Sequence, residues 1–249
     1  MRTVDSLLAE MQETRDIIDS FPEYRGMEMH ITEFNTSYNP FCPIHDTNLN
    51  AAYMAGVLAR MGDVAASYSY WTFGDVFEEQ GVPPMPFHGG FGLIANGQIA
   101  KPTLWSFAFF SHLRGTPVHR DEHSVIVRKD DGSYEGVLWN LCRTELTVTI
   151  ALPAGGEQTL TTETVDEVTC NPLKVWHDLG EPRSLSENQL RLLRQAGQPA
   201  ADTAVLAAEN GECTLQMTLR QNAVVRFTLS ARNQQGDYGY DYTWYQQHS

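Results

Sequence analysis

The spacing of apolar residues changes at about residue 117. Before this point, apolar residues recur at helical spacing in two segments, and two short, largely apolar runs have the length of strands. The helical segments are residues 4–18 and 54–61, and the strand-like runs are residues 28–34 and 66–73. The order helix, strand, helix, strand predicts a parallel sheet covered by helices, in which residues 28–34 form a buried strand.

A segment without periodicity follows, from residue 74 to residue 97. Loops of this length are usually functional or disordered, and the glycine and phenylalanine content of this one favours an ordered lid. The next predicted helix, residues 104–113, is apolar on most sides. We therefore expect it to be buried between two bodies.

After residue 117 the period changes to two, as in antiparallel strands. Residues 124–128 and 134–140 flank Asp130-Asp131-Gly132-Ser133, which is a hairpin signal. The further expected strands are residues 146–152, 213–219 and 223–229. Together these segments predict an antiparallel β-sandwich.

A helical insert is expected to interrupt the sandwich, from residue 171 to about residue 198. Ser184 and Glu187 have the spacing of a capping box, and Leu190, Leu193 and Ala196 form the apolar stripe of the helix that follows.

Three regions of the chain are therefore expected: residues 1–116, the sandwich at 117–230, and a tail at 231–249. In the tail, aromatic residues alternate with small or polar ones (Tyr238, Tyr240, Tyr242 and Trp244). A disordered terminus, an edge strand and a strand that binds a partner all remain open for it.

Composition limits the partners and the compartment. The formal net charge is −14, from 31 acidic and 17 basic residues, which disfavours binding to nucleic acid or to an anionic membrane. The four cysteines form no C-x-x-C pair, and neither a signal peptide nor a membrane span is recognisable. We expect a cytoplasmic protein whose cysteines are reduced and mostly buried.

One carboxylate has a suggestive position. Glu33 lies where the first strand passes into a polar loop, the place where (β/α) barrels carry their catalytic groups. A structural glutamate that pairs with a lysine or caps a loop is the alternative. Trp71 follows 38 residues later, at the matching end of the next strand, so both side chains are expected to face the same way.

Histidines and glycines offer weaker signals. His45, Asp46 and His88 on separate loops are a weak metal pattern, and we expect His45 to hold its loop in place instead. His30, in mid-strand, is expected to be a hydrogen-bonded core residue. Residues 89–92 are rich in glycine, but no Lys-Ser or Lys-Thr follows them, so a phosphate loop is not indicated. A tight loop over the site is the better interpretation.

Several motifs, in order, resemble the β-xylosidases of glycoside hydrolase family 39. The motifs are His30-Ile31-Thr32-Glu33-Phe34-Asn35-Thr36-Ser37-Tyr38, Cys42-Pro43-Ile44-His45-Asp46-Thr47, Ser69-Tyr70-Trp71-Thr72-Phe73, Asp75-Val76-Phe77-Glu78-Glu79 and Phe87-His88-Gly89-Gly90-Phe91-Gly92-Leu93. The resemblance continues past the helical part and covers roughly residues 20–230. Several motifs in the right order are far more specific than any single one.

The resemblance implies a retaining hydrolase on a (β/α)8 TIM barrel with an attached β-sandwich. It assigns Glu33 as the nucleophile, Trp71 as the wall of the sugar subsite, and Glu78 and Glu79 as groups that contact sugar hydroxyls. It also implies a xylo-oligosaccharide or xyloside substrate, with no metal and no cofactor. These residue types suit the chemistry, because an ionised carboxylate can attack the anomeric carbon and an indole can stack on a pyranose.

The second carboxyl group of the family has no counterpart here. The general acid and base of the family lies in an Asn-Glu-Pro motif, which this sequence does not contain. Only the last two barrel strands and three helices are recognisable, so the fold expected is α/β plus all-β: a partial barrel followed by the sandwich. We expect the chain to be inactive alone, and to associate with the missing barrel segment or form a homo-oligomer. Glu78 or Glu79 as a substitute acid, and a non-catalytic assembly or carbohydrate-binding module, are the alternatives.

Overall fold

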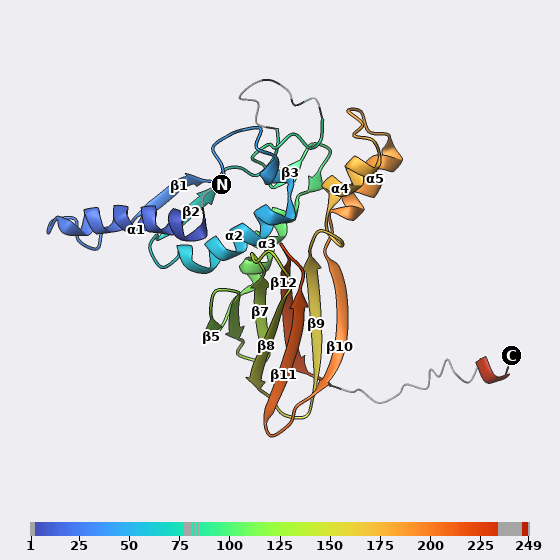
Figure 1. Cartoon of the computed structure of the whole chain (residues 1–249). Helices are drawn as coiled ribbons and strands as arrows, with labels where there is room; N and C mark the ends of the chain where they lie inside the picture. The colour runs from blue at the N-terminus through green and yellow to red at the C-terminus, as the bar shows by residue number, and fades with distance from the viewer. Residues whose placement is uncertain (1–2, 77–80, 82, 84, 234–245, 249) are drawn as a thin grey trace.

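Helices pack beside a small sheet in the first part of the chain, and long antiparallel strands form the second part (Figure 1). The computed structural model describes residues 3–76, 81, 83, 85–233 and 246–248. Glu78, Glu79 and most of the aromatic tail lie outside the described residues. No helix in the described ranges has both the length and the apolar character needed to cross a membrane.

The first part follows the predicted order of helices and strands. Its elements are α1 Val4–Ser20, β1 His30–Phe34, the 3-10 helix η1 Pro43–Asp46, α2 Asn48–Met61, β2 Ser67–Tyr70, β3 Ile94–Ala95, β4 Ile99–Ala100 and α3 Pro102–His112. Strands β1 and β2 pair in parallel, with Phe34 opposite Tyr70. The Thr3 hydroxyl accepts a hydrogen bond from the backbone N–H of Ser6 and so caps α1.

Strand β1 is exposed along most of its length, so the expectation of a buried strand was wrong. Phe34 is buried and Ile31 is half-buried, but Thr32 and Glu33 face solvent. His30 was expected in the core and is exposed as well, with Nδ1 2.8 Å from the hydroxyl of Ser67. The reason is that β2 alone pairs with β1 among the described residues, so the other edge of β1 stays open.

Helix α3 packs between α2 and the antiparallel strands, as its apolar sequence predicts, although only four of its residues are buried. Ser106 is fully buried and donates a hydrogen bond to the carbonyl oxygen of Ala51 in α2, at 2.8 Å. Phe109 packs in a cluster that includes Trp139 and Val224 from the sheet beneath. The helical part and the sheet part therefore share a core.

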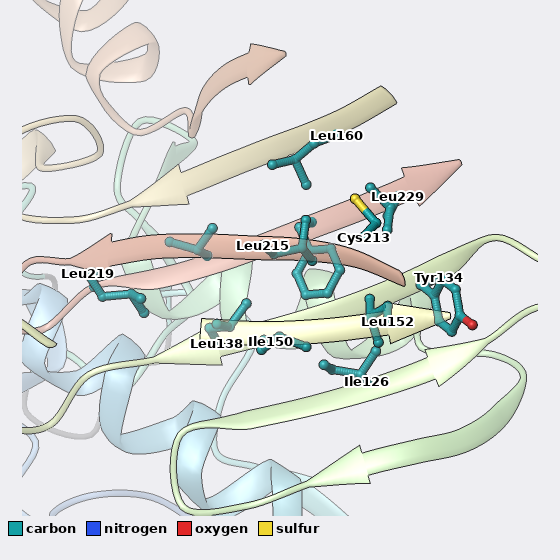
Figure 2. Close-up of a cluster of buried hydrophobic side chains, with 13 residues drawn as sticks. Ile126, Tyr134, Leu138, Ile150, Leu152, Leu160, Cys213, Leu215, Leu219 and Leu229 are labelled. Atoms are coloured by element: carbon teal, nitrogen blue, oxygen red, sulfur yellow. The ribbon is translucent and has the colours of Figure 1, made fainter. Parts of the chain in front are cut away.

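The second part contains two antiparallel sheets that face each other. Its strands are β5 Thr116–Arg120, β6 Ser124–Arg128, β7 Tyr134–Trp139, β8 Leu146–Pro153, β9 Glu157–Val165, β10 Ala200–Ala207, β11 Glu212–Leu219 and β12 Val224–Ala231. Six of them form one sheet in the order β10-β9-β12-β7-β6-β5, and β11 pairs with β8. Side chains of both sheets, among them Leu138, Ile150, Leu215 and Leu229, fill the space between them (Figure 2).

The predicted hairpin at Asp130–Ser133 is confirmed, because it joins the paired strands β6 and β7. Strands β9 and β10 were not predicted. Both are rich in threonine or alanine and lack a clean alternation of apolar and polar residues. Their place is set by the ladder that β9 forms with β12 and β10, which a local pattern does not reveal.

The helical insert consists of α4 Pro172–Asp178 and α5 Glu187–Ala196, between β9 and β10. The capping box of α5 is formed by Ser186 and Gln189, so the predicted pair of Ser184 and Glu187 was wrong by two residues. The Ser186 backbone N–H donates to Gln189 Oε1 at 3.0 Å, and the Ser186 hydroxyl oxygen accepts from the Gln189 N–H at 3.3 Å.

The insert packs against the long loop of the first part. Trp176 of α4 and Leu193 of α5 are buried in one cluster with Phe87 and Ile99. Figure 1 shows α4 and α5 rising above the sheet beside this loop. The insert thus supports the loop that follows β2.

Candidate active site

Glu33 lies near the end of β1 and is exposed, whereas the next residue is anchored in the core. Phe34 is 7% exposed and meets Tyr68 and Tyr70 edge-on, at ring-centroid distances of 6.1 and 5.8 Å. No ion pair or hydrogen bond of the Glu33 side chain is found within the described part of the chain. The alternative of a structural, paired glutamate therefore has no support in these contacts.

Trp71 follows β2 and lies at the same end of the sheet. Its backbone N–H donates to the carbonyl oxygen of Phe34 at 3.0 Å, so the strand pairing extends to this residue. The side chain is half-buried, and the peptide bond between Trp71 and Thr72 is cis. The parallel register places Glu33 and Trp71 at the same end of the sheet. That their side chains face the same way stays a prediction.

Asn35 connects the ends of the two strands. Its side-chain amide donates to the carbonyl oxygen of Trp71 and, at 3.5 Å, to that of Phe91. Its Oδ1 accepts from the backbone N–H of Thr36 at 2.7 Å. Asn35 was not singled out from the sequence, although it stands inside the motif that carries the resemblance.

A buried chain of hydrogen bonds continues from this point into two helices. The Thr36 hydroxyl donates to Asn50 Oδ1 on α2, and Asn50 Nδ2 donates to the Thr103 hydroxyl on α3 at 2.9 Å. The hydroxyl of Tyr70 is 3.5 Å from Asn50 Nδ2. Burial raises the pKa of Tyr70, so its phenol stays protonated.

Lys101 forms a buried ion cluster with Asp46 and Asp75. Its Nζ lies 2.6 Å from Asp46 Oδ1 and 2.6 Å from Asp75 Oδ2, and it donates to the carbonyl oxygen of Gly90 at 2.9 Å. These three partners use all three donors of the ammonium. Lys101 is fully buried and the two aspartates nearly so.

The glycine-rich loop wraps around the two aspartates of this cluster. The N–H of Gly89 donates to Asp46 Oδ2 and that of Gly92 to Asp75 Oδ1, each at 2.7 Å. A Cβ at Gly92 would lie 2.4 Å from the backbone nitrogen of Asp75, so no other residue fits there. The glycines therefore allow a tight loop, as predicted, and its N–H groups bind carboxylates of the same chain.

His45 holds the same loop in place, as predicted. Its Nδ1 lies 2.8 Å from the carbonyl oxygen of Gly89, which can only accept, so Nδ1 carries the proton. Burial lowers the pKa of His45, and the nearby Lys101 ammonium lowers it further. The ring is therefore neutral at pH 7. Among the described residues, no group of three or more potential ligands could hold a metal ion.

A small hollow lies between the loops. It is lined in part by Phe41, Thr72, Asp75, His88 and Phe91, and its volume is about 30 Å³. This volume suits about one water molecule, whereas ligand sites usually measure several hundred Å³. This hollow is therefore too small to enclose a sugar ring.

Some of the predicted assignments remain predictions. The roles of Glu33 as nucleophile and Trp71 as subsite wall rest on position and resemblance, and Glu78 and Glu79 lie outside the described residues. Lys101 was missed, because a single lysine before a proline-initiated helix carries no recognisable sequence signal.

Comparison with known proteins places this geometry in a family. Residues 2–214 match the family model described as glycosyl hydrolases family 39. The chain is 40% identical to a β-xylosidase of Geobacillus stearothermophilus over 226 residues, or 88% of this chain and 44% of that protein. It is 28% identical to a β-xylosidase of Caldicellulosiruptor saccharolyticus over 220 residues, with the same 44% of that protein covered.

Solved structures agree in fold. A family 39 enzyme from Xanthomonas axonopodis pv. citri superposes with a TM-score of 0.79 at 26% identity, covering 90% of this chain and 49% of that one. A monomeric β-xylosidase from Caulobacter crescentus gives a TM-score of 0.81 at 24% identity, covering 93% and 51%. The chain thus spans about half the length of these relatives. The match of the family model over most of its residues shows that the chain belongs to glycosyl hydrolase family 39.

Proposed function

We propose that this chain carries the nucleophile side of a retaining β-xylosidase site, with Glu33 as nucleophile. One observation carries the proposal: in a chain of this family, Glu33 is exposed near the end of β1, at the same end of the sheet as Trp71, and has no partner among the described residues. The named relatives are β-xylosidases, which favours a xyloside or xylo-oligosaccharide as substrate. Trp71 serves as a stacking wall, and Glu78 and Glu79 accept hydrogen bonds from sugar hydroxyls.

The chemistry needs two carboxyl groups. The Glu33 carboxylate attacks the anomeric carbon, a carbon–oxygen bond to the enzyme forms, and the bond to the leaving oxygen breaks. A general acid gives that oxygen a proton, and the same group later takes a proton from the water that releases the sugar. The two carboxyl groups of a retaining enzyme stand about 5–5.5 Å apart. The Asn-Glu-Pro motif that holds the acid in the family does not occur in this sequence.

The exposed surfaces of the first part support a partial barrel. We propose that residues 1–116 form the last two βα units of a (β/α)8 barrel and that residues 117–230 form a β-sandwich with the insert. The open edge of β1 and the apolar side chains near the end of α1 are then the surfaces that preceding units cover. These side chains are Ile17, Phe21, Tyr24 and Met27, each about half exposed.

The isolated chain is therefore proposed to be inactive on ordinary xylosides. Activity requires the general acid, supplied by association with the preceding barrel segment or by another copy in a homo-oligomer. A fusion provides the direct test, because the chain is 40% identical to the Geobacillus stearothermophilus protein. The part of that protein before the aligned region is joined to this chain. The fusion is expected to release nitrophenol from an aryl β-xyloside, and the isolated chain is not.

The nucleophile can be tested in a reaction that does not depend on the acid. A 2-deoxy-2-fluoroxyloside with a dinitrophenolate leaving group needs no proton on that group, and the fluorine slows release of the bound sugar. Mass spectrometry of the labelled fusion is expected to find the sugar on the peptide that contains Glu33. Glu33→Gln abolishes the label, whereas the control Glu28→Gln, an exposed residue of the same stretch, keeps it. A label on another carboxylate, or none on a fusion that binds xylose, contradicts the assignment.

A non-catalytic binding or assembly module is the second candidate. The observation in its favour is that the hollow between the loops measures only about 30 Å³, too little for a sugar, whereas the core of the two sheets is intact. This candidate predicts that the isolated chain binds xylo-oligosaccharides in calorimetry and that Glu33→Gln leaves the binding unchanged. It also predicts a fusion without turnover.

A further inference from the structure

The buried Lys101 cluster is connected to both strand ends of the candidate site. Asp46 ends η1, in the connection after β1, and Asp75 lies just after β2. Both carboxylates bind the ammonium of Lys101 and, on their other oxygen, an N–H of the glycine-rich loop. One buried cation thus joins the connections after β1 and β2 to the segment between residues 89 and 92.

The loop in turn fixes the backbone beside Trp71. The carbonyl oxygen of Phe91 accepts from the N–H of Thr72 at 3.2 Å and from the side chain of Asn35 at 3.5 Å. The N–H of Leu93 donates to the carbonyl oxygen of Thr72 at 3.1 Å. The same Asn35 amide also donates to the carbonyl oxygen of Trp71. The loop therefore holds Asn35, which lies two residues after Glu33.

We propose that Lys101 is a positioning residue of the sugar site: it holds residues 89–92 against Asp46 and Asp75, and through Phe91 it sets the Trp71 wall relative to Glu33. The proposal rests on the proposed function. Lys101 itself is fully buried below the loops, so it acts through its neighbours and does not touch the sugar.

Charge explains why the arrangement depends on this lysine. The cluster combines one ammonium with two carboxylates, both almost entirely buried. Without the ammonium, two carboxylates would remain desolvated next to each other, which is unfavourable unless one takes up a proton or the chain moves apart. The loop is the part expected to move, since Asp75 follows a paired strand and Asp46 is itself buried at the end of η1.

Two variants and one matched control test the proposal. Lys101→Met removes the cation and keeps an unbranched side chain. Asp46→Asn keeps the shape and one ion pair, so it preserves the fold if Lys101→Met does not. The control is Lys129→Met, which removes another lysine that pairs with a buried carboxylate, Glu135, in the antiparallel sheet.

The first measurement is hydrogen exchange of the isolated chain. In whichever cluster variant is folded, the amides of Gly89, Gly92 and Leu93 are expected to exchange at least tenfold faster, while amides of β7 and β12 keep their rates. Lys129→Met leaves the loop amides unchanged. Unchanged loop exchange in a folded cluster variant overturns the proposal. This measurement does not depend on catalysis, so it remains decisive if the fusion proves inactive and the proposed function fails.

The second measurement is steady-state kinetics of the active fusion. A misplaced wall is expected to lower kcat/KM by about 100-fold, because displacements near 1 Å have effects of this size. The loss should lie mainly in kcat, and the labelling rate of Glu33 should fall in parallel. A cluster variant that is folded at the assay temperature, with normal kcat and KM and only a lower melting temperature, shows a purely structural role and overturns the proposal.

Discussion

The backbone N–H of Trp71 is bonded to the carbonyl oxygen of Phe34, at 3.0 Å. This single hydrogen bond extends the pairing of β1 and β2 by one residue beyond the strands. It brings the two residues singled out on opposite strands, Glu33 and Trp71, to the same end of the sheet. The position of Glu33 relative to Trp71 therefore depends on how β1 and β2 pack.

Phe34 is expected to provide much of the stability of this sheet. Phe34→Ala removes a side chain that is 7% exposed and should lower the free energy of unfolding by about 3–5 kcal/mol. Thr32→Ala, on the exposed face of the same strand, should change it by less than about 0.5 kcal/mol. Urea unfolding followed by circular dichroism measures both, and similar losses in the two variants would contradict this packing.

The indole of Trp71 is expected to contribute to sugar binding in the active fusion. Stacking is worth about 0.5–1.5 kcal/mol beyond the area that it buries, so Trp71→Ala should lower kcat/KM on an aryl xyloside by roughly tenfold. Trp105→Phe is the control, because Trp105 donates to the carbonyl oxygen of Gly197, outside the site. A larger kinetic effect of Trp105→Phe would argue against Trp71 as the wall.

The cysteines are expected to differ in reactivity. Burial raises the pKa of Cys170 to about 12 and also raises that of Cys213, so neither forms a thiolate at pH 8. Cys42 and Cys142 are half-buried. Titration of the native chain with a thiol reagent should modify these two quickly and the other pair only after unfolding. Rapid modification of Cys170 would contradict the described burial.

Asp166 should make stability depend on pH. Burial favours its neutral form, but hydrogen bonds from Arg220 and from the N–H groups of Val168 and Thr169 prevail, and the pKa of Asp166 lies below its usual value. A lowered pKa means that the stabilisation is present above the unfolded-state pKa, about 3.9, and is lost as the pH falls through the lower folded-state value.

The matching experiment compares wild type with Asp166→Asn. From pH 7 to about pH 5 the variant should be less stable by about 1–3 kcal/mol, and the difference should shrink below about pH 4. Urea unfolding at several pH values measures it. A difference that does not change with pH would show that the charge of Asp166 has no part in it.

The capping box of α5 is expected to stabilise the helical insert. Ser186→Ala should lower the free energy of unfolding by about 1 kcal/mol, since the N–H of Gln189 then loses its partner. Ser184→Ala changes an exposed serine two residues earlier and should have almost no effect. Hydrogen exchange of the α5 amides checks the cap. Equal acceleration in Ser184→Ala and Ser186→Ala would contradict it.

The sequence predicted most where the pattern is local. Helical spacing located α1 and α2, and alternation located β8 and β11, because the apolar residues of each element recur with the period of its own backbone. It missed β9, whose many threonines suit a strand but whose place is set by pairing with β12. It also placed β1 in a core, although the chain supplies only one neighbour for that strand among the described residues.

The residues of the candidate site also differ in whether the sequence could identify them. Motifs identified Glu33, Trp71 and the glycine-rich loop, since these lie in short conspicuous stretches. Lys101 was not identifiable, because its function depends on Asp46 and Asp75, which lie 55 and 26 residues earlier in the sequence. A cytoplasmic location and a homo-oligomeric state stay predictions.

The packing of α3 and of the helical insert also bears on whether the two parts of the chain can be exchanged separately in evolution. Phe109 shares a cluster with Trp139 of the sheet, and Leu193 of the insert shares one with Phe87 of the loop and Ile99 of β4. The change of period near residue 117 therefore does not mark a detachable module. Gene shuffling that exchanged the strand-rich half for another would remove the packing partners of α3 and of the loop that follows β2, so the two halves should evolve together.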